Sequence, residues 1–373
     1  MKKRILFLMS DTGGGHRASA QAIKEAIEYL HPDRYDIIIE DIWKNHMPWP
    51  LNSIPDSYGW LTGPGLSLWQ AIWWVSNFPR LQRYGFAVIA PLVTGNVARY
   101  LKTIRPDLVV SVHPLMNHLG LIWLKAAGLK VPFITIVTDL VTFHPAWICP
   151  EVTHCIVPTD PARQRAIRYG MPAEKLAVYG QPVSLKFAHL QGDKQTLRRQ
   201  LKLEVDRSVV LIVGGGEGFG QVYDIAQQLA QTVPQAQLLI VTGRNHPLKQ
   251  KLEAVSWAIP IRVYGFVDNM PELMRAADVL ITKAGPGTIS EAFIAGLPPV
   301  ISGYIPGQET GNVTYIQEHD AGAYADTPRA IAQIVQEWLN PHNPIPHQMA
   351  ENAARLARPQ ASLQIATDLC QYV

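Results

Sequence analysis

The sequence predicts an α/β protein built from two Rossmann-like, doubly wound domains. Short apolar runs alternate with segments of helical periodicity, which is typical of parallel sheets covered by helices. The alternation restarts near residue 209 with the plan of the N-terminus, a strand followed by a glycine-rich loop and a helix. The chain also has 373 residues, which is too long for one ordinary core. Together these observations favour two domains.

The first element is a buried strand over Ile5–Met9, an unbroken apolar run of the kind found in parallel sheets. Apolar residues then recur at helical spacing up to Leu30. Between strand and helix lies "DTGGGHRAS", which contains three glycines and His16. Glycine lets the backbone approach a ligand closely, and a helix start offers free N–H groups, so the loop indicates a phosphate site. His16 is placed to act on such a ligand.

Two other interpretations fit this loop when it is taken alone. One is a tight strand-to-helix turn with an exposed histidine. The other is a dinucleotide site, because Gly13, Gly15 and Ala18 satisfy the pattern G-x-G-x-x-A. Glu40 and Asp41 end the next predicted strand at about the distance that such a site requires.

The remaining elements of the first half follow the same alternation. Strands are predicted at 35–39, 108–112, 133–137 and 155–157, and helices near 97–104 and 119–127. The pattern stops near residue 182, and a polar stretch containing a helix follows. We therefore expect a first domain at 1–182 and a linker at 183–206.

The second half begins with a strand at 209–213. Further strands are predicted at 238–242, 261–264, 279–282 and 300–302. We expect a second domain at 207–345 and a C-terminal helical segment at 346–373. The glycine loop containing Gly215 and Gly216 fits neither the P-loop pattern nor G-x-G-x-x-G, so a P-loop and a second dinucleotide site are disfavoured.

Composition favours a globular protein that is rather poor in charge, with 47% hydrophobic and 17% charged residues. The three cysteines, Cys149, Cys155 and Cys370, lack zinc spacing and an even count, which favours a reducing compartment and thiols that serve packing. Neither a signal peptide nor an apolar run long enough to span a bilayer is recognised. We expect a soluble or monotopic protein.

One interval is aromatic and basic. Six of the ten tryptophans lie between residues 43 and 74, and no carboxylate occurs between Asp56 and Asp107. Glycine and proline interrupt this interval, so it is typical of a segment that lies in a bilayer interface and meets anionic headgroups. The alternative is an inter-domain or dimer contact. The residues expected at the membrane are Trp69, Trp73, Trp74, Arg80 and Arg83.

The densest group of polar residues lies between Gly265 and Asn312. The stretch "KAGPGT", which begins at Lys283, follows a predicted strand and opens a helix, so backbone N–H groups and the Thr288 hydroxyl are placed to hold a diphosphate. Glu291 follows one turn later, where a carboxylate can accept both hydroxyls of a ribose. The alternative is a polar turn without a ligand.

Other side chains of this group follow neighbouring strand ends. Phe266 and Val267 offer an aromatic ring and a backbone edge for a flat base. Amide and carboxylate groups that suit sugar hydroxyls come from Gln308, Glu309 and Asn312. The carboxyl ends of parallel strands form the crevice where open α/β sheets bind ligands, so we expect these groups to converge there.

Four motifs carry a resemblance to a known family. "SDTGGGHRASA", "VTDLVTFHPAW", "GFVDNMPELMRAADVLITKAGPGTISEA" and "IPGQETGN" resemble the monogalactosyldiacylglycerol synthase and processive diacylglycerol glucosyltransferase family. The similarity covers nearly the whole chain. It implies a GT-B fold, with two Rossmann-like domains facing a cleft and a C-terminal helix crossing back to the first domain. The first domain would bind the acceptor and the second the nucleotide sugar.

The resemblance also implies roles for individual residues. His16 would be the acceptor base, or would stabilise the transition state. The acceptor side would include Gly14, Gly15, Asp139, His144 and Trp147. The donor side would include Gly215, Gly216, Phe266, Val267, Lys283, Gly285, Pro286, Gly287, Thr288, Glu291, Gln308, Glu309 and Asn312. Within that set, uracil meets Phe266 and Val267, the ribose meets Glu291, the diphosphate meets Gly287 and Thr288, and the hexose meets Gln308, Glu309 and Asn312.

The implied reaction is inverting transfer of galactose from UDP-galactose to 1,2-diacylglycerol. The expected partners are a UDP-sugar, diacylglycerol and an anionic membrane surface that the protein meets peripherally on the cytoplasmic face; no nucleic acid is expected. UDP-hexose would be a co-substrate, and anionic lipid is an expected activator. No cofactor or metal is expected, because helix N-termini and Lys283 can stabilise the departing UDP and because no D-x-D motif is recognised.

UDP-glucose remains an alternative donor, because galactose and glucose differ at one hydroxyl. A UDP-sugar epimerase would need no lipid acceptor and no aromatic, basic interval. A protein that binds nucleotide sugars without turnover is the non-enzymatic alternative. A dehydrogenase is disfavoured, because it would not explain the second glycine loop or the polar group at 265–312.

Overall fold

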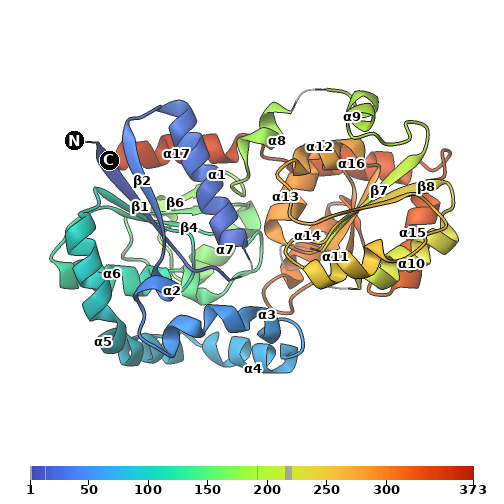
Figure 1. Cartoon of the computed structure of the whole chain (residues 1–373). Coiled ribbons are helices and arrows are strands. Elements are labelled where there is room, and N and C mark those ends of the chain that lie inside the picture. Colours follow the sequence, from blue (N-terminus) through green and yellow to red (C-terminus); the bar gives the residue numbers. More distant parts are fainter. Residues whose placement is uncertain (1, 13, 191, 215–220) are drawn as a thin grey trace. The chain divides into compact units, whose positions relative to one another are not determined.

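The computed structural model describes the chain except for residues 1, 13, 191 and 215–220, and it leaves out the side chains of 79–84 and 86–88. The chain forms two compact units (Figure 1). The first contains Met1–Leu185, Pro306–Gln308 and Gln360–Val373, and the second contains Lys186–Ile305 and Glu309–Pro359. Each unit holds one six-stranded sheet of parallel strands, so the predicted class of two doubly wound α/β units is confirmed.

The first unit has the strand order β2-β1-β3-β4-β5-β6. Its strands are β1 (Lys3–Met9), β2 (Tyr35–Asp41), β3 (Leu108–Ser111), β4 (Phe133–Ile136), β5 (His154–Val157) and β6 (Leu176–Val178). The order reverses at β1, which pairs with β2 on one side and β3 on the other. Open α/β sheets bind ligands beyond the carboxyl ends of strands at such a reversal. β6 is too short and too little buried to be recognised in the sequence.

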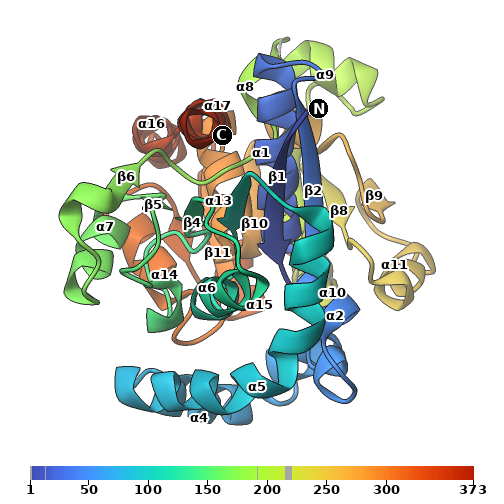
Figure 2. The same cartoon turned by 90° about the vertical axis from the view of Figure 1, so that its left-hand side faces the viewer.

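The helices of the first unit cover both faces of this sheet. They are α1 (Gly15–Leu30), α2 (Ile42–His46), α3 (Tyr58–Leu61), α4 (Leu66–Ser76), α5 (Pro79–Ile104), α6 (Met116–Ala127), α7 (Asp160–Arg168) and α17 (Ala361–Leu369). Short 3-10 turns lie at Leu51–Ser53, Pro55–Ser57, Pro145–Trp147, Ala173–Lys175 and Cys370–Tyr372. Figure 2 shows α4 and α5 next to each other at the lower edge of this unit.

The side chains of β1 alternate between two apolar layers. Ile5 and Phe7 pack with residues of α1 and α17, whereas Leu6 and Leu8 pack with residues of α5 and α6. Burying such a side chain fully contributes about 1.5–3 kcal/mol. A strand with both faces buried is therefore held firmly, and the loop that follows β1 starts from a fixed point.

α5 is much longer than the predicted helix near 97–104. It has 26 residues and contains Pro91. Val93, Val97 and Leu101 recur at helical spacing and are buried, and this packing outweighs the single hydrogen bond that proline removes. The prediction stopped short because proline and glycine in this stretch are signals for a helix end.

The last helix, α17, belongs to the first unit and packs on α1, as the fold prediction required. Ile365 and Leu369 are buried there. The preceding helix, α16 (Ile345–Leu356), belongs to the second unit. The C-terminal helical segment thus consists of two helices that pack on different units.

The second unit has the strand order β12-β11-β10-β7-β8-β9. Its strands are β7 (Ser208–Val213), β8 (Ala236–Val241), β9 (Ile261–Tyr264), β10 (Val279–Lys283), β11 (Pro299–Gly303) and β12 (Ala323–Tyr324). The order reverses between β7 and β10, so the expected ligand position lies at the carboxyl ends of these two strands. The two-residue strand β12 gives no recognisable pattern in the sequence.

Helices again flank the second sheet. They are α9 (Lys194–Gln200), α10 (Val222–Thr232), α11 (His246–Glu253), α12 (Met270–Ala276), α13 (Pro286–Ala295), α14 (Thr310–Glu318), α15 (Pro328–Trp338) and α16. The short helix α8 (Leu185–His189) stands where the chain passes from the first unit to the second. The core contains apolar residues of β7, β8, α10 and α15.

Within the described part of the chain, no helix is both long and apolar enough to cross a bilayer. The same residues contain no cluster of three or more histidine, cysteine or acidic side chains arranged to hold a metal ion. Cys149 and Cys155 are buried, as expected from the sequence, and Cys370 is partly exposed.

Candidate active site

The glycine loop after β1 is fixed to the neighbouring strand. Gly14 precedes α1 with φ of 81°, a backbone conformation that favours glycine. At the end of β2, the Asp41 carboxylate accepts a hydrogen bond from the Asp11 backbone N–H at 3.1 Å. A side chain at Gly15 would meet no atom within 4 Å, so packing does not require glycine there. The open space before α1 suits the close approach of a ligand.

His16 and His113 meet at the carboxyl ends of adjacent strands. His16 follows β1 through the glycine loop, and His113 follows β3 directly. Because β1 and β3 pair, the two rings lie edge to face with centroids 4.6 Å apart. The candidate base thus lies where the strand order of the first sheet reverses.

The His16 ring is partly buried and held by two groups. Its Nδ1 lies 3.0 Å from the hydroxyl of Thr138, and the ring also hydrogen-bonds the backbone of Val112. Burial lowers the pKa of His16 to about 4, against smaller opposing effects from the Val112 bond and the negative charge of Asp11. The imidazole is therefore neutral at pH 7, the state in which it can accept a proton.

His113 is almost fully buried, and its tautomer follows from its contacts. Nδ1 accepts from the Leu115 backbone N–H at 3.3 Å, so the proton resides on Nε2, which lies 3.3 Å from the Thr12 hydroxyl. Burial and the neighbouring His16 hold the pKa of His113 well below its ordinary value. This ring is a neutral neighbour of the candidate base.

Asp139 and Trp147 form a bonded pair beside His16. The Trp147 indole N–H donates to Asp139 Oδ2 at 2.7 Å, and its ring centroid lies 5.9 Å from that of His16. Asn117 holds this pair in place. Its side-chain N–H donates to the carbonyl of Trp147 at 3.1 Å, and its side-chain oxygen accepts from the Thr135 hydroxyl at 2.9 Å. Asp139 and Trp147, two of the acceptor-side residues expected from the sequence, thus lie beside the candidate base.

His144 belongs to the same loop but contacts helix α4. Its Nδ1 accepts from the Ala146 backbone N–H at 3.1 Å, and its Nε2 lies 3.1 Å from the Ser76 hydroxyl. Burial lowers the pKa of His144 to about 4, so this ring is also neutral at pH 7.

The aromatic interval divides between buried and exposed side chains. Trp69 and Trp73 are only partly exposed, with ring centroids 5.9 Å apart, whereas Trp74 is 68% exposed. The predicted membrane residues Arg80 and Arg83 lie outside the described side chains. The interval also exposes apolar side chains that are not among the five residues expected at the membrane: Trp49, Ile54, Trp60, Leu68, Ile72, Val75, Phe78 and Leu92.

In the second unit, the loop after β10 combines a helix start with a cation. α13 begins at Pro286, and a side chain at Gly287 would meet no atom within 4 Å. The Lys283 ammonium lies 3.5 Å from the position that a Cβ of Gly285 would occupy, so it folds back toward the helix start. A cation is unfavourable at a helix N-terminus, and an anion bound there would offset both positive charges.

Glu291 lies inside α13 and is only partly exposed. Burial raises the pKa of its carboxyl to about 7. A carboxyl that titrates near neutral pH beside a helix start is unusual and marks a candidate ligand contact.

Glu309 pairs with Lys283. One carboxylate oxygen bonds the Lys283 ammonium, and the other accepts from the Ile305 backbone N–H at 2.9 Å. The Glu309 side chain is 4% exposed. Asn312 is buried too, and its amide donates to the Ala284 carbonyl at 2.9 Å. Both residues hold the loop that carries Lys283, and their expected contacts with a hexose stay predictions.

Other predicted donor residues are distributed over three places. Phe266 follows β9 with 76% of its surface exposed, and Val267 is partly buried. Gln308 groups with the first unit, where its amide donates to Asp139 at 3.3 Å. Gly215 and Gly216 lie outside the described residues.

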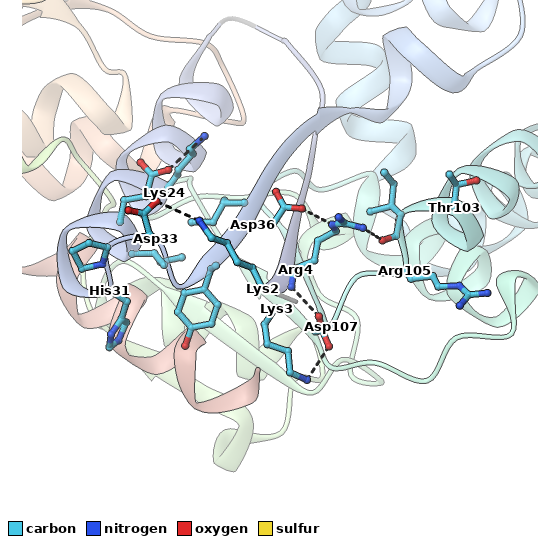
Figure 3. Close-up of a pocket in the computed structure, with 16 residues that line it drawn as sticks. Lys2, Lys3, Arg4, Lys24, His31, Asp33, Asp36, Thr103, Arg105 and Asp107 are labelled. Atoms are coloured by element: carbon cyan, nitrogen blue, oxygen red, sulfur yellow. Dashed lines mark hydrogen bonds and ion pairs between the residues drawn. The ribbon is translucent and has the colours of Figure 1, made fainter.

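A charged hollow of the first unit lies at the amino ends of its strands, on the side of the sheet away from the candidate site. It has a volume of about 1010 Å³ and opens at the amino ends of β1 and β2 (Figure 3). Its cations pair with its own carboxylates: Lys3 with Asp107 at 2.9 Å and Arg4 with Asp36 at 2.7 Å. Since ligands of parallel sheets bind at the carboxyl ends, this hollow is not part of the candidate site.

Comparison with known proteins identifies the family. Residues 16–183 match the family model described as monogalactosyldiacylglycerol (MGDG) synthase, and residues 209–365 match the glycosyltransferase family 28 C-terminal domain. A probable chloroplastic monogalactosyldiacylglycerol synthase of Glycine max is 42% identical over 380 residues, which cover 100% of this chain and 72% of that protein. The chain belongs to the monogalactosyldiacylglycerol synthase family. The resemblance seen in the sequence is confirmed.

Solved structures support the fold of this MGDG synthase family member. MurG of Acinetobacter baumannii is 17% identical with a TM-score of 0.63, and each chain covers 99% of the other. HepE of Anabaena in complex with UDP-glucose is 16% identical with a TM-score of 0.59, covering 99% of this chain and 98% of that chain. The MGDG synthase family member is thus a hexosyltransferase of the GT-B-like fold.

Several residues around the candidate base of this MGDG synthase family member were missed by sequence reasoning. His113 carries a usable signal, because it directly follows a predicted strand next to that of His16. Thr138 stands beside the predicted Asp139 and could have been found in the same way. Asn117 and Ser76 carry no signal, since their partners lie about 30 and 70 residues away and only the folded chain brings them together.

Proposed function

We propose that the chain transfers galactose from UDP-galactose to 1,2-diacylglycerol, with inversion, and yields monogalactosyldiacylglycerol. Family membership supports both substrates, since its relatives are monogalactosyldiacylglycerol synthases. The observation that carries the proposal is the neutral His16 imidazole in the glycine loop at the strand-order reversal of the first unit. A base in that position is what an alcohol acceptor requires.

At the acceptor, His16 takes the proton of the diacylglycerol hydroxyl as its oxygen attacks the anomeric carbon. The new bond joins this oxygen to the sugar, and the bond between the anomeric carbon and the diphosphate breaks, so its electron pair leaves with UDP. In the free protein the low pKa makes His16 a weak base, and the negative charge that the donor brings for transfer would raise that pKa toward neutrality. The donor itself would thus activate the base.

At the donor, the start of α13 and Lys283 receive the diphosphate. Backbone N–H groups and an ammonium stabilise most strongly the negative charge that develops as UDP departs. Glu291 accepts hydrogen bonds from the ribose hydroxyls when it is ionised, and the exposed ring of Phe266 stacks on uracil.

The donor sugar is tested by incubating the purified full chain with diacylglycerol and labelled UDP-galactose or UDP-glucose, followed by lipid chromatography. We expect a single galactosylated lipid. A preference for glucose would replace the donor assignment. Conversion of the UDP-sugar without lipid would instead indicate an epimerase.

We also propose that transfer needs no divalent metal, because Lys283 and the start of α13 supply the positive charge that a metal would otherwise provide. Treatment of the purified enzyme with a chelator should leave the rate of galactolipid formation within about twofold of the untreated rate. A chelated enzyme that regains activity only with Mg²⁺ or Mn²⁺ would contradict this mechanism.

Helix α4 is proposed to dock the protein peripherally on the cytoplasmic face of a membrane, and Arg80 and Arg83 of the following helix are proposed to meet anionic lipid. Leu68, Ile72 and Val75 follow each other at helical spacing, and each is 45–50% exposed. Trp74 and Phe78 extend this apolar surface. Diacylglycerol stays in the bilayer, and a short apolar helix with exposed tryptophan fits the headgroup region.

The variant Leu68→Gln/Ile72→Gln/Trp74→Gln should reduce sedimentation with anionic, diacylglycerol-containing vesicles at least about tenfold, because three apolar contacts with the bilayer are lost. Ile122→Gln on α6 is the matched control, since Ile122 is exposed apolar surface of the same unit. UDP affinity should stay unchanged in both. Sedimentation of the triple variant like the wild type would show that this surface serves a protein partner.

A further inference from the structure

Helix α4 is attached to the first unit by one face. Trp69, Trp73 and Ser76 recur at helical spacing and are partly buried, next to the exposed Leu68 and Ile72. No residue of α4 is fully buried. Because so little of α4 is buried, its position depends on a small number of hydrogen bonds and ring contacts. The directed contact at its C-terminal end is the bond between Ser76 and His144.

The hydrogen atoms of this contact have one consistent arrangement. The Ala146 backbone N–H donates to His144 Nδ1 at 3.1 Å, so the ring proton resides on Nε2. The Ser76 hydroxyl donates to the Ile72 carbonyl at 2.6 Å, which leaves its oxygen free to accept from His144 Nε2 at 3.1 Å. The His144 ring also bonds the Ser76 backbone. The Trp73 ring lies edge-on to the imidazole with centroids 5.0 Å apart. Both ring nitrogens are therefore in use.

The same loop reaches the base. His144 caps the 3-10 turn Pro145–Trp147, and Asn117 bonds the carbonyls at the end of that turn. Trp147 then donates to Asp139 and lies 5.9 Å, centroid to centroid, from His16. A continuous set of contacts thus runs from the exposed helix to the acceptor half of the site.

We propose that His144 is a positioning residue that couples helix α4 to the acceptor site, in place of a direct contact with the acceptor. When α4 docks on a bilayer, the bond from His144 to Ser76 fixes the loop of Asp139 and Trp147 beside His16 and orders the site for an alcohol in that bilayer. This inference rests on the proposed function. It names the membrane surface as the signal that completes the site.

Two variants break the bond from opposite ends. His144→Asn keeps a side-chain oxygen that can accept from the Ala146 N–H as an N-cap, but it is too short to reach Ser76. Ser76→Ala removes the accepting hydroxyl, leaves the histidine intact and keeps its bond to the Ser76 backbone. Ser67→Ala is the matched control, because Ser67 is an exposed serine of the same helix.

His144→Asn should lower kcat/KM for bilayer diacylglycerol about tenfold, the scale of one hydrogen bond. Ser76→Ala should lower it by less, because the bond from His144 to the Ser76 backbone remains. The vesicle sedimentation and UDP dissociation constant of both variants should equal those of the wild type and of Ser67→Ala. The double variant should lose no more than His144→Asn alone, because that substitution already removes the ring that Ser76 contacts. Wild-type kcat/KM in folded His144→Asn, or additive losses in the double variant, would overturn the coupling.

Hydrogen exchange provides a readout that does not depend on catalysis. Binding to vesicles should slow exchange of the backbone amides of residues 139–147 in the wild type at least about fivefold more than in His144→Asn. Equal protection in both proteins would overturn the inference. A wild-type chain that shows this difference but forms no glycolipid would overturn the proposed function alone.

Discussion

Replacement of His16 by alanine is expected to lower the rate of galactosyl transfer by about 100-fold or more, because a positioned general base contributes roughly 10²- to 10⁴-fold. The ring is neutral at pH 7 and partly buried, and it lies beside the bonded pair of Asp139 and Trp147. Steady-state rates with diacylglycerol vesicles and labelled UDP-galactose give the measurement.

The fold and the affinity for UDP should survive this substitution, because the proposed donor groups all lie in other elements. His347→Ala is the matched control, since the His347 side chain is 81% exposed on α16. The control should retain the wild-type rate. A His16→Ala enzyme that keeps the wild-type rate would remove the base assignment.

The second large effect is expected at Glu291. Glu291→Ala should raise the dissociation constant of UDP about 30- to 100-fold at pH 8, since two hydrogen bonds from the ribose to a charged acceptor are lost. Calorimetry with UDP alone measures this directly, without a lipid. Glu318→Ala, at the exposed end of α14, is the control. An unchanged constant in Glu291→Ala would place the nucleotide elsewhere.

Glu291 also predicts how UDP binding depends on pH. Its pKa of about 7 means that the carboxyl is protonated in the free protein below pH 7 and ionised above it. The ionised form is the better acceptor for ribose hydroxyls, so UDP affinity should fall as the pH falls through 7, and binding below pH 7 should release a proton. Glu291→Gln should bind UDP more weakly at pH 8 and lose this dependence. Equal pH profiles for Glu291→Gln and the wild type would contradict the assignment.

Much of the fold follows from the sequence because strands buried on both faces leave unbroken apolar runs. The run Ile5–Met9 and the helical spacing after it locate β1 and α1, and the plan is repeated in the second unit. Parallel strands end at one edge of a sheet, so a residue that follows a strand is close to the site by topology alone. The positions of His16 after β1 and of Lys283 at the end of β10 were predictable for this reason.

Which face a side chain presents within the aromatic interval did not follow from the sequence. α4 is apolar on all sides, so its periodicity does not distinguish Trp73, which packs beside His144, from the exposed Trp74. The same holds for Glu309 and Asn312, whose burial depends on strands and loops that only the folded chain brings together. Contacts between distant residues leave no period in a sequence.

The position of α17 has a consequence for biosynthesis. Ile5, Phe7 and Ile23 share an apolar layer with Ile365, more than 300 residues later in the chain. A ribosome that adds about 5–20 residues per second needs roughly 10 to 40 s to travel from the end of β6 to α17. During that time α17 has not been synthesised, so it cannot cover this apolar layer of the first unit. A nascent chain of this protein therefore carries an uncovered apolar face to which chaperones can bind. A truncated chain that lacks α17 would be expected to aggregate.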